Sequence, residues 1–494
     1  MTAAILTFDL GTTALKTALI DEGGNLLAID TREYALLTPQ PNRVEMLPDS
    51  YWQAACAGTR AVLAKTGIAA DAVQAIGMSS QGQTFIPLDP AGTPLGNAIV
   101  WLDNRAQAIA DAWEADWLTR DDYARISGYP FIPAGLTVFK IAWLAQHAPE
   151  MHRAWKFLCL PDYLLYLLTG ETATDYVTAR MAGLFDLQTG DWEPRLLAAA
   201  GITAAQLPTV LPPGHCAGQL RAHAAAALGL PAGIPVCVGA NDQLAGAVGA
   251  GNIAPGIATE TTGTALALIA TTPALLTHDH IAVGRHALPN LYYAMTYHDI
   301  SAIILKWFRD LCAPNEPYDR FLADIDQVPP GSDGLVVLPH FAGMTVPRFD
   351  PTARGAFIGL TLGHTRAHLA RAIMESCACL LLDCLQPIAE QESIHVIRSL
   401  GGAARNLAWL QMKADLLGIP VERPRCADAA SLGAAMLAAT GIGWFTDAAQ
   451  ASTAWYRPDR AFTPDPARTE VYRQVYARYH ELSERLQGFV PVMG

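Results

Sequence analysis

Short apolar runs separated by polar turns open the chain. In Leu6–Ile20, apolar residues stand on both sides of Gly11 and two threonines, which predicts two strands joined by a tight turn. A glycine pair makes the next turn before the apolar run Leu26–Ile29, so three successive antiparallel strands are expected. Asp49–Lys65 then changes to a helical spacing of apolar residues and predicts the first helix.

The hairpin pattern occurs a second time. Ile257–Ile269 again has a strand, a Thr-Gly-Thr turn and an apolar strand, about half a chain further on. This repeat predicts two related domains, residues 1–250 and 251–494, each opening with a hairpin aimed at a shared cleft. Helical patterns dominate residues 106–230, which we expect to form a lid or subdomain, and a long helix is expected over Arg366–Glu392.

The tip of the first hairpin concentrates polar side chains. Asp9 ends the first strand, Gly11 lets the backbone approach a ligand, and the turn continues with Thr12, Thr13 and Lys16. Such a turn could hold phosphate-bound Mg²⁺ through Asp9 while donors approach the phosphate oxygens. The alternative, which the hairpin by itself favours, is that the aspartate and the threonines only satisfy the turn.

Two polar loops follow predicted buried strands, at the strand ends where open sheets place ligands. The side chains there that could hydrogen-bond to a polyol or stack on it are Gln81, Gln83, Trp101 and Asp103. Alternatively, Asp103 caps a helix that begins near Arg105.

Two strand-to-helix connections carry further candidates. Asp242 follows a strand and precedes a small-residue helix, so it is either a general base or the N-cap of that helix, and the glycines around it weakly favour the base. Gly401 and Gly402 lie between the strand Ile394–Leu400 and the helix Leu407–Leu417, where they could hold adenosine or phosphate. A tight connection is the alternative for this glycine pair.

The composition restricts the class of protein. The 494 residues allow two or three domains, and a net charge of −13 without a Lys/Arg cluster argues against a nucleic-acid partner. We expect neither a membrane-spanning segment nor a signal peptide, and the nine cysteines have the apolar surroundings of buried thiols in a reducing cytoplasm. The motifs of P-loop kinases, dinucleotide enzymes and zincins are absent from the sequence.

Seven segments, taken together and in order, resemble the FGGY family of carbohydrate kinases. That family has an α/β fold of two actin-like (ribonuclease H-like) ATPase domains, with mixed sheets flanked by helices. The resemblance covers about residues 5–440 and is greatest to xylulokinases. The segments are Phe8–Thr13, Ile76–Gln81, Trp101–Arg105, Leu160–Tyr163 with Leu168–Glu171, Gly239–Gln243, Thr262–Thr264 and Gly401–Asn406.

This resemblance implies transfer of the γ-phosphoryl group of Mg-ATP to a sugar hydroxyl, with Asp242 as the base and Asp9 placing Mg²⁺. It implies a sugar-binding and phosphate-binding N-terminal domain and a nucleotide-binding C-terminal domain that close over the substrates. The residues that would line the phosphates are Gly11, Thr12, Thr13, Lys16, Thr262, Gly263 and Thr264. The nucleoside would be held by Gly401, Gly402 and Asn406. The sugar would be contacted by Gln81, Gly82, Gln83, Trp101, Asp103, Asp242 and Gln243.

One loop departs from the family pattern. Xylulokinases usually have Ser-Gly-Gln-Met-His-Gly where this chain has Ser79–Thr84, so Gly82 replaces a methionine and Gln83 a histidine. We therefore expect a roomier pocket with different hydrogen bonds. D-xylulose is the first expectation for the substrate, and another ketose such as ribulose, or a polyol such as erythritol or glycerol, is the alternative.

Two alternatives are not kinases. The first is an actin-like, nucleotide-switched binding protein, which would need a polymer interface or a peptide-binding domain that the sequence does not show. The second is a non-catalytic sugar sensor, against which the intact Asp242 argues. The family contains monomers and oligomers; a homodimer is an expectation for which no residue marks an interface.

Overall fold

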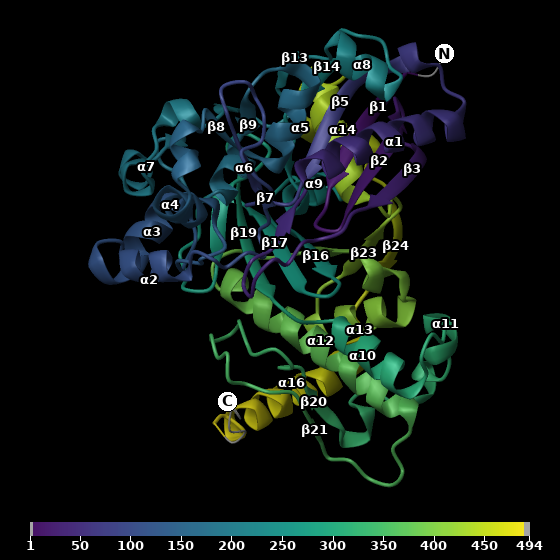
Figure 1. Cartoon of the computed structure of the whole chain (residues 1–494). Coiled ribbons are helices and arrows are strands. Elements are labelled where there is room, and N and C mark those ends of the chain that lie inside the picture. The colour runs from purple at the N-terminus through teal and green to yellow at the C-terminus, as the bar shows by residue number, and fades with distance from the viewer. Residues whose placement is uncertain (1–2, 489–494) are drawn as a thin grey trace. The chain divides into compact units, whose positions relative to one another are not determined.

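The protein, described here by a computed structural model of residues 3–488, divides into two units (Figure 1). Unit 1 runs to residue 253 and also contains residues 283–292 and 428–456; unit 2 contains the other described residues. Residues 428–456, which the sequence places in the second domain, thus lie with unit 1. The reason is packing, because helix α14 (Ala429–Gly441) contacts strands β1 (Ala4–Leu10) and β5 (Val73–Ser80).

The main sheet of unit 1 is built around β1. This strand is antiparallel to β2 and parallel to β5, and β2 is antiparallel to β3, so the three successive antiparallel strands are confirmed. The order is β13-β14-β5-β1-β2-β3, with β15 pairing to β5. The bounds are β2 (Ala14–Asp21), β3 (Leu26–Glu33), β13 (Cys216–Gln219), β14 (Pro235–Cys237) and β15 (Ala240–Asn241).

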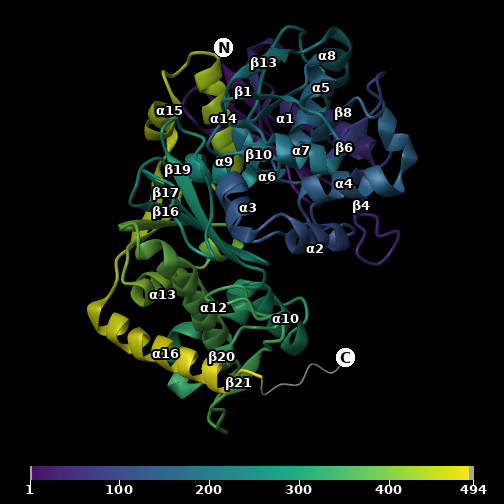
Figure 2. The same cartoon turned by 90° about the vertical axis from the view of Figure 1, so that its left-hand side faces the viewer.

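The two faces of this sheet carry different helices. Side chains alternate along β5, so Ile76 joins the core of α1 (Pro48–Thr66), α5 (Leu160–Thr169) and α8 (Ala222–Leu228), whereas Gly77 faces α14. A Cβ atom at Gly77 would lie 2.6 Å from the carbonyl oxygen of Ala434, so only glycine allows this approach. Helix α9 (Asp242–Gly249) lies beside α14 (Figure 2).

The remainder of unit 1 forms a second core around α4, which includes Phe85 and Ile99. The helical character expected for residues 106–230 is confirmed, but α5 and α8 pack on the main sheet, and the remainder also contains short strands, including the sheet β4-β7-β6-β8. The helices are α2 (Gln107–Asp116), α3 (Arg120–Ser127), α4 (Thr137–His147), α6 (Tyr176–Met181) and α7 (Pro194–Ala200), whereas α15 (Ala448–Trp455) packs on α14 and α9. The strands are β4 (Glu45–Met46), β6 (Phe85–Leu88), β7 (Ala98–Ile99), β8 (Lys156–Cys159), β9 (Ala173–Asp175), β10 (Phe185–Asp186), β11 (Asp191–Trp192) and β12 (Thr209–Leu211).

Unit 2 repeats the pairing around its own hairpin. β16 is antiparallel to β17 and parallel to β22, as β1 is to β2 and β5, so the predicted repeat is confirmed at the level of topology. The order runs β19-β17-β16-β22-β23-β24. The strands are β16 (Ile257–Thr262), β17 (Leu266–Thr272), β19 (Tyr292–His298), β20 (Val336–Leu338), β21 (Ala356–Ile358), β22 (Val396–Leu400), β23 (Val421–Pro424) and β24 (Pro458–Phe462), whereas most of β18 (Ala282–Arg285) belongs to unit 1.

Helices α10, α12, α13 and α16 enclose the core of unit 2. By length and composition alone, α12 is long and apolar enough to cross a membrane. However, 83% of its 18-residue apolar stretch is buried inside the protein, as is usual for a core helix. The bounds are α10 (Ile303–Cys312), α11 (Tyr318–Phe321), α12 (Arg366–Ala389), α13 (Leu407–Leu417) and α16 (Pro466–Arg485).

Candidate active site

A charged cluster lies at the first hairpin of unit 1. The β1–β2 register places Asp9 opposite Lys16, whose Nζ is 3.5 Å from Asp9 Oδ2 and donates to Asp428 Oδ1 at 2.8 Å. Ser79 Oγ donates to Asp9 Oδ1 at 2.9 Å. Burial raises the pKa of Asp9, although Lys16 and the Ser79 hydroxyl act in the opposite direction. Asp428 is not among the residues predicted from the sequence, because nothing in the sequence indicates its contact with Lys16.

The turn of this hairpin is joined to two residues that were predicted to contact the sugar. Gln81 Nε2 donates to Gly11 O at 3.1 Å, and Thr12 Oγ1 donates to Gln81 Oε1 at 3.3 Å. Trp101 Nε1 in turn donates to Thr12 Oγ1 at 2.9 Å, while Thr13 is exposed. Both ends of the Gln81 amide therefore support the hairpin, and Thr12 is the junction between the phosphate-binding and the sugar-binding candidates.

Asp242 is the first residue of α9, directly after β15. The N-cap is Asn241, whose side chain accepts from the backbone N–H of Gln243, so the N-cap interpretation of Asp242 is wrong. Asp242 Oδ1 accepts from Gln243 N at 2.8 Å and from Asn241 Nδ2 at 2.9 Å. Burial and then the negative charge of Asp9 raise the pKa of Asp242 to about 7. A half-buried carboxylate with this pKa can accept a proton near neutral pH.

The loop after β5 has a different shape from the one expected. The sequence predicts a roomier pocket because Gly82 replaces a methionine, but Met181 of α6 occupies the space. A Cβ atom at Gly82 would lie 3.0 Å from Met181 Cβ and 3.1 Å from its Cε. Gln83 Nε2 donates to the Tyr129 hydroxyl at 3.1 Å, and that hydroxyl is 3.5 Å from the Met181 sulfur. Residues from three segments thus form the wall of this part of unit 1.

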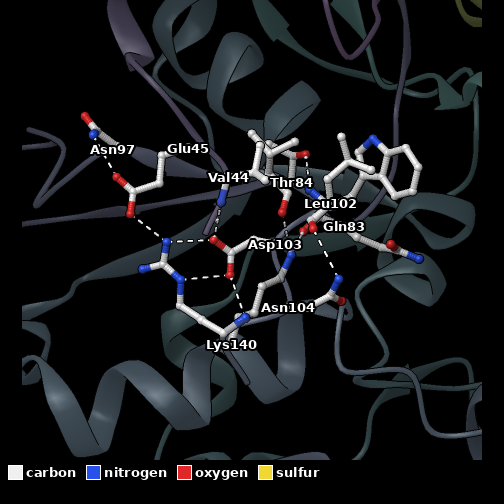
Figure 3. Close-up of polar contacts among 12 residues, drawn as sticks. Val44, Glu45, Gln83, Thr84, Asn97, Leu102, Asp103, Asn104 and Lys140 are labelled. Carbon is white, nitrogen blue, oxygen red and sulfur yellow. Dashed lines mark hydrogen bonds and ion pairs between the residues drawn. The ribbon is translucent and has the colours of Figure 1, made fainter. Parts of the chain in front are cut away.

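Trp101 and Asp103 differ in their accessibility. The Trp101 side chain is 40% exposed and can stack on a ligand, whereas Asp103 is fully buried. Asp103 accepts from Val44 N at 2.7 Å and from Nε and Nη2 of Arg105 at 2.8 and 2.7 Å, and Arg105 also pairs with Glu45 (Figure 3). Neither interpretation of Asp103 describes this arrangement, because the carboxylate is enclosed by protein donors and α2 begins later, at Gln107. Its role is to fix the turn that carries Trp101.

The second hairpin, in unit 2, has a buried ion pair beneath its turn. Lys413 Nζ donates to Glu260 Oε1 at 2.5 Å and to Thr262 Oγ1 at 2.8 Å, and Thr262 Oγ1 donates to Glu260 Oε2 at 2.6 Å. Glu260 and Lys413 are both fully buried. The Thr262 hydroxyl is therefore used internally, and the Gly263 N–H donates to Ala265 O, which leaves the exposed Thr264 as the part of this turn that can meet a phosphate. Sequence reasoning missed this pair, since its members are far apart in the chain.

The glycine pair follows β22 beside this hairpin, because Leu400 pairs with Thr261. Gly401 has φ 78° and ψ −166°, a conformation that essentially only glycine adopts. No atom lies within 4 Å of a Cβ built on Gly402, so this position is open to a ligand. Asn406 caps α13, with its Oδ1 accepting from Trp409 N at 2.9 Å. The glycines are thus a tight connection that also leaves backbone accessible.

The residues present fit a magnesium ion that arrives with a nucleotide. Within residues 3–488, no three His, Cys, Asp or Glu side chains converge to hold a metal by themselves. Mg²⁺ is usually bound through one or two carboxylates together with substrate phosphates and water. Asp9, whose buried carboxylate accepts from the Ser79 hydroxyl and lies 3.5 Å from Lys16 Nζ, is the group that suits this role.

Comparison with known proteins defines the class. The chain matches the FGGY family of carbohydrate kinases, N-terminal domain, over residues 4–249, and the C-terminal domain of the same family over residues 258–442. It therefore belongs to the FGGY family of carbohydrate kinases, phosphotransferases with a two-domain fold that matches actin-like ATPase structures, as its resemblance to that family implied.

The relatives differ in the substrate that their names carry. A xylulose kinase of Bacillus subtilis is 28% identical over 98% of this chain and 99% of its own. A glycerol kinase of Methylibium petroleiphilum is 34% identical over 93% of this chain and 95% of its own. The structure of a gluconate kinase from Lactobacillus acidophilus matches with a TM-score of 0.90 at 25% identity, over 98% of both chains. These relatives are all named as kinases but differ in the named substrate, so the similarity does not identify the sugar that this chain phosphorylates.

Proposed function

We propose that this carbohydrate kinase transfers the γ-phosphoryl group of ATP to a terminal hydroxyl of a ketopentose, with D-xylulose, giving D-xylulose 5-phosphate, as the first candidate. The observation that carries the proposal is Asp242, a carboxylate at the start of α9 whose pKa of about 7 suits a general base at neutral pH. The xylulose kinase relative supports a ketopentose. Another ketose or a polyol is the second candidate, and the glycerol kinase relative supports it.

In this proposal Asp242 takes the proton from the attacking sugar hydroxyl, which becomes more nucleophilic as it approaches phosphorus. Lys16 and the backbone around Gly11 offset the phosphate charge. Asp9 would hold Mg²⁺, and the ion would supply charge neutralisation at the phosphate oxygens. Trp101, with its exposed indole, and Gln83 orient the sugar.

Unit 2 supplies the nucleotide side of the proposal. The turn of Gly263 and Thr264 meets phosphate oxygens, and the accessible backbone at Gly401 and Gly402 receives the nucleoside. We also propose a cytoplasmic location and a homodimer; light scattering after size-exclusion chromatography tests the latter.

The test is ADP release with Mg-ATP over a panel of ketopentoses, polyols, hexoses and gluconate. We expect turnover on D-xylulose that is lost in Asp242→Asn. Asp447→Asn is the matched control, because Asp447 caps α15 and asparagine caps helices equally well. Turnover on a polyol alone would select the second candidate. Slow ADP release that no sugar stimulates would refute the kinase and favour a nucleotide-switched protein or a sensor.

A further inference from the structure

Lys140 is a fully buried lysine that the reaction outlined above does not use. It lies on α4, and its Nζ donates to two backbone carbonyls, Val100 O at 3.1 Å and Gln83 O at 3.3 Å (Figure 3). Burial lowers the pKa of Lys140 to about 7, although the charge of Asp103 acts in the opposite direction. Burying an ammonium group is costly, and an apolar residue would fill the same core position without that cost.

The carbonyl of Gln83 belongs to a strained turn. Thr84 N donates to Gly82 O at 2.8 Å, a bond between residues i+2 and i, and the central residue Gln83 has φ 67°. A γ-turn with positive φ is rare and strained, and a residue other than glycine keeps it only when its surroundings hold it there. Thr137 Oγ1, one helical turn before Lys140, donates to the same Gln83 carbonyl at 2.9 Å.

The carbonyl of Val100 belongs to the segment that carries the Trp101 indole. Val100 directly precedes Trp101, and Trp101 N donates to Thr84 Oγ1 at 3.1 Å. Lys140 therefore joins the two segments that present the predicted sugar-contacting side chains, Gln83 and Trp101. A change in either carbonyl position would rotate the side chain attached to that segment.

We infer that Lys140 is a positioning residue for sugar recognition: with Thr137 it holds the γ-turn at Gln83 and joins that turn to the segment of Trp101. This inference rests on the proposed function. Lys140 and Thr137 thus form a clamp through their hydrogen bonds to the carbonyls of Gln83 and Val100. Loss of this clamp frees Gln83 to relax from its strained conformation and displaces its amide from the sugar. Misplacement of a binding group by about 1 Å can cost on the order of 100-fold in rate, so we expect kcat/KM for the sugar to fall roughly 10- to 100-fold. The KM for ATP should stay within about twofold, because neither carbonyl belongs to the phosphate-binding turn.

A purely structural lysine would behave differently, and Lys156 provides the comparison. Its Nζ also donates to two backbone carbonyls, Ala205 O at 2.9 Å and Leu207 O at 2.6 Å, outside the sugar loop. Lys156→Met removes the same kind of interaction and should change the melting temperature without changing the KM for the sugar. Lys140→Met should change both.

The experiment compares Lys140→Met, Thr137→Val, the double variant and Lys156→Met in the full chain. KM and kcat are measured for ATP, for D-xylulose or the best sugar of the panel, and for the second-best sugar. We expect a raised sugar KM in both single variants, a double variant that is less than additive, and a smaller preference between the two sugars. Thr137→Val removes only a hydroxyl, so it still tests the clamp if Lys140→Met fails to fold.

Loss of the proposed kinase activity and loss of the role of Lys140 are distinguished by different results. A wild-type enzyme that phosphorylates no sugar refutes the proposed function and the inference with it. An active wild type whose Lys140→Met and Thr137→Val variants keep the wild-type sugar KM overturns only the inference. The inference is also overturned if the KM values for the sugar and for ATP change in parallel, since that pattern indicates a general loss of folded enzyme.

Discussion

The ionisation of Asp242 should control the rate of sugar phosphorylation. Its pKa is about 7 because of burial and the nearby charge of Asp9. A base with this pKa is about one-eleventh deprotonated at pH 6 and about ten-elevenths deprotonated at pH 8, so kcat/KM should rise about tenfold between the two. Asp242→Asn cannot accept the proton and should lose about 10²- to 10⁴-fold in kcat.

The assay is ADP release from pH 5.5 to 9 at saturating Mg-ATP, with limiting sugar, for the wild type and Asp242→Asn. The residual activity of Asp242→Asn is the control. A rise of kcat/KM with pH that comes from ionisation of the nucleotide would persist in this variant, whereas a rise that comes from Asp242 would be lost. Asp9→Asn removes the charge that raises the pKa of Asp242, so the limb should move to lower pH in whatever activity remains. A flat wild-type profile between pH 6 and 8, or the same limb in Asp242→Asn, would refute the assignment of Asp242 as the base.

The same ionisation has a consequence for stability. The pKa of Asp242 is higher in the folded protein than in the unfolded chain, so the folded state loses stability as pH rises from about 4 to about 7. Asp242→Asn lacks this penalty. Above pH 7 the variant should be more stable than the wild type, by at most about 4 kcal/mol. The actual difference should be smaller than this limit, because solvent screens a half-buried group. Below about pH 4 the two proteins should be equally stable. Chemical denaturation at pH 5 and pH 8 measures the difference; a variant that is less stable at pH 8 would contradict it.

Three further predictions concern other parts of the chain. Trp101→Ala should raise the KM for the sugar about tenfold, with a smaller effect in Trp101→Phe, because stacking on an exposed indole is lost. Glu260→Gln leaves Lys413 buried without a counterion and should destabilise unit 2 by about 3 to 5 kcal/mol in denaturant unfolding, whereas an unchanged midpoint would contradict the role of the pair. The hydrogen bond to Asp383 raises the pKa of His480, so the stability from this pair should be complete below pH 6.5 and should decline as pH rises through the raised value. Thermal melts of His480→Asn should lack that decline.

The features that could be predicted from the sequence are those made by neighbours in the chain. The hairpin at Gly11 and its repeat at Gly263 depend on local turn chemistry and alternating apolar residues, and both have the predicted pairing. The close packing of α9 on α14 also follows from small residues that the sequence shows directly. A Cβ at Gly433 would lie 1.8 Å from the carbonyl oxygen of Ala245.

The features that could not be predicted depend on pairs far apart in the chain. Asp428 and Lys16 meet although 412 positions separate them. The same contacts bring residues 428–456 into unit 1, where a linear division of the chain does not place them. Asp103 illustrates a different limit. Its position in a polar loop suggested a ligand, but Arg105 and Val44 N satisfy it completely, and burial is not visible in a sequence.

The substrate pocket is the part of the site for which a family pattern is least informative, and Gly82 shows the reason. Loss of the methionine at this position suggested extra room, yet Met181, which lies 99 positions later, packs against Gly82, so the room beside the loop is set by another element of the fold. A phosphate-binding turn binds its ligand mainly with backbone groups of one segment. A sugar-binding wall, by contrast, is built from side chains of several elements. We therefore expect Gln83, Tyr129 and Met181, which contact one another, to determine the sugar specificity together. A single substitution toward the usual xylulokinase residue, Gly82→Met, should then clash with Met181 and weaken the binding of every sugar. The double variant with Gly82→Met and Met181→Gly should restore sugar binding.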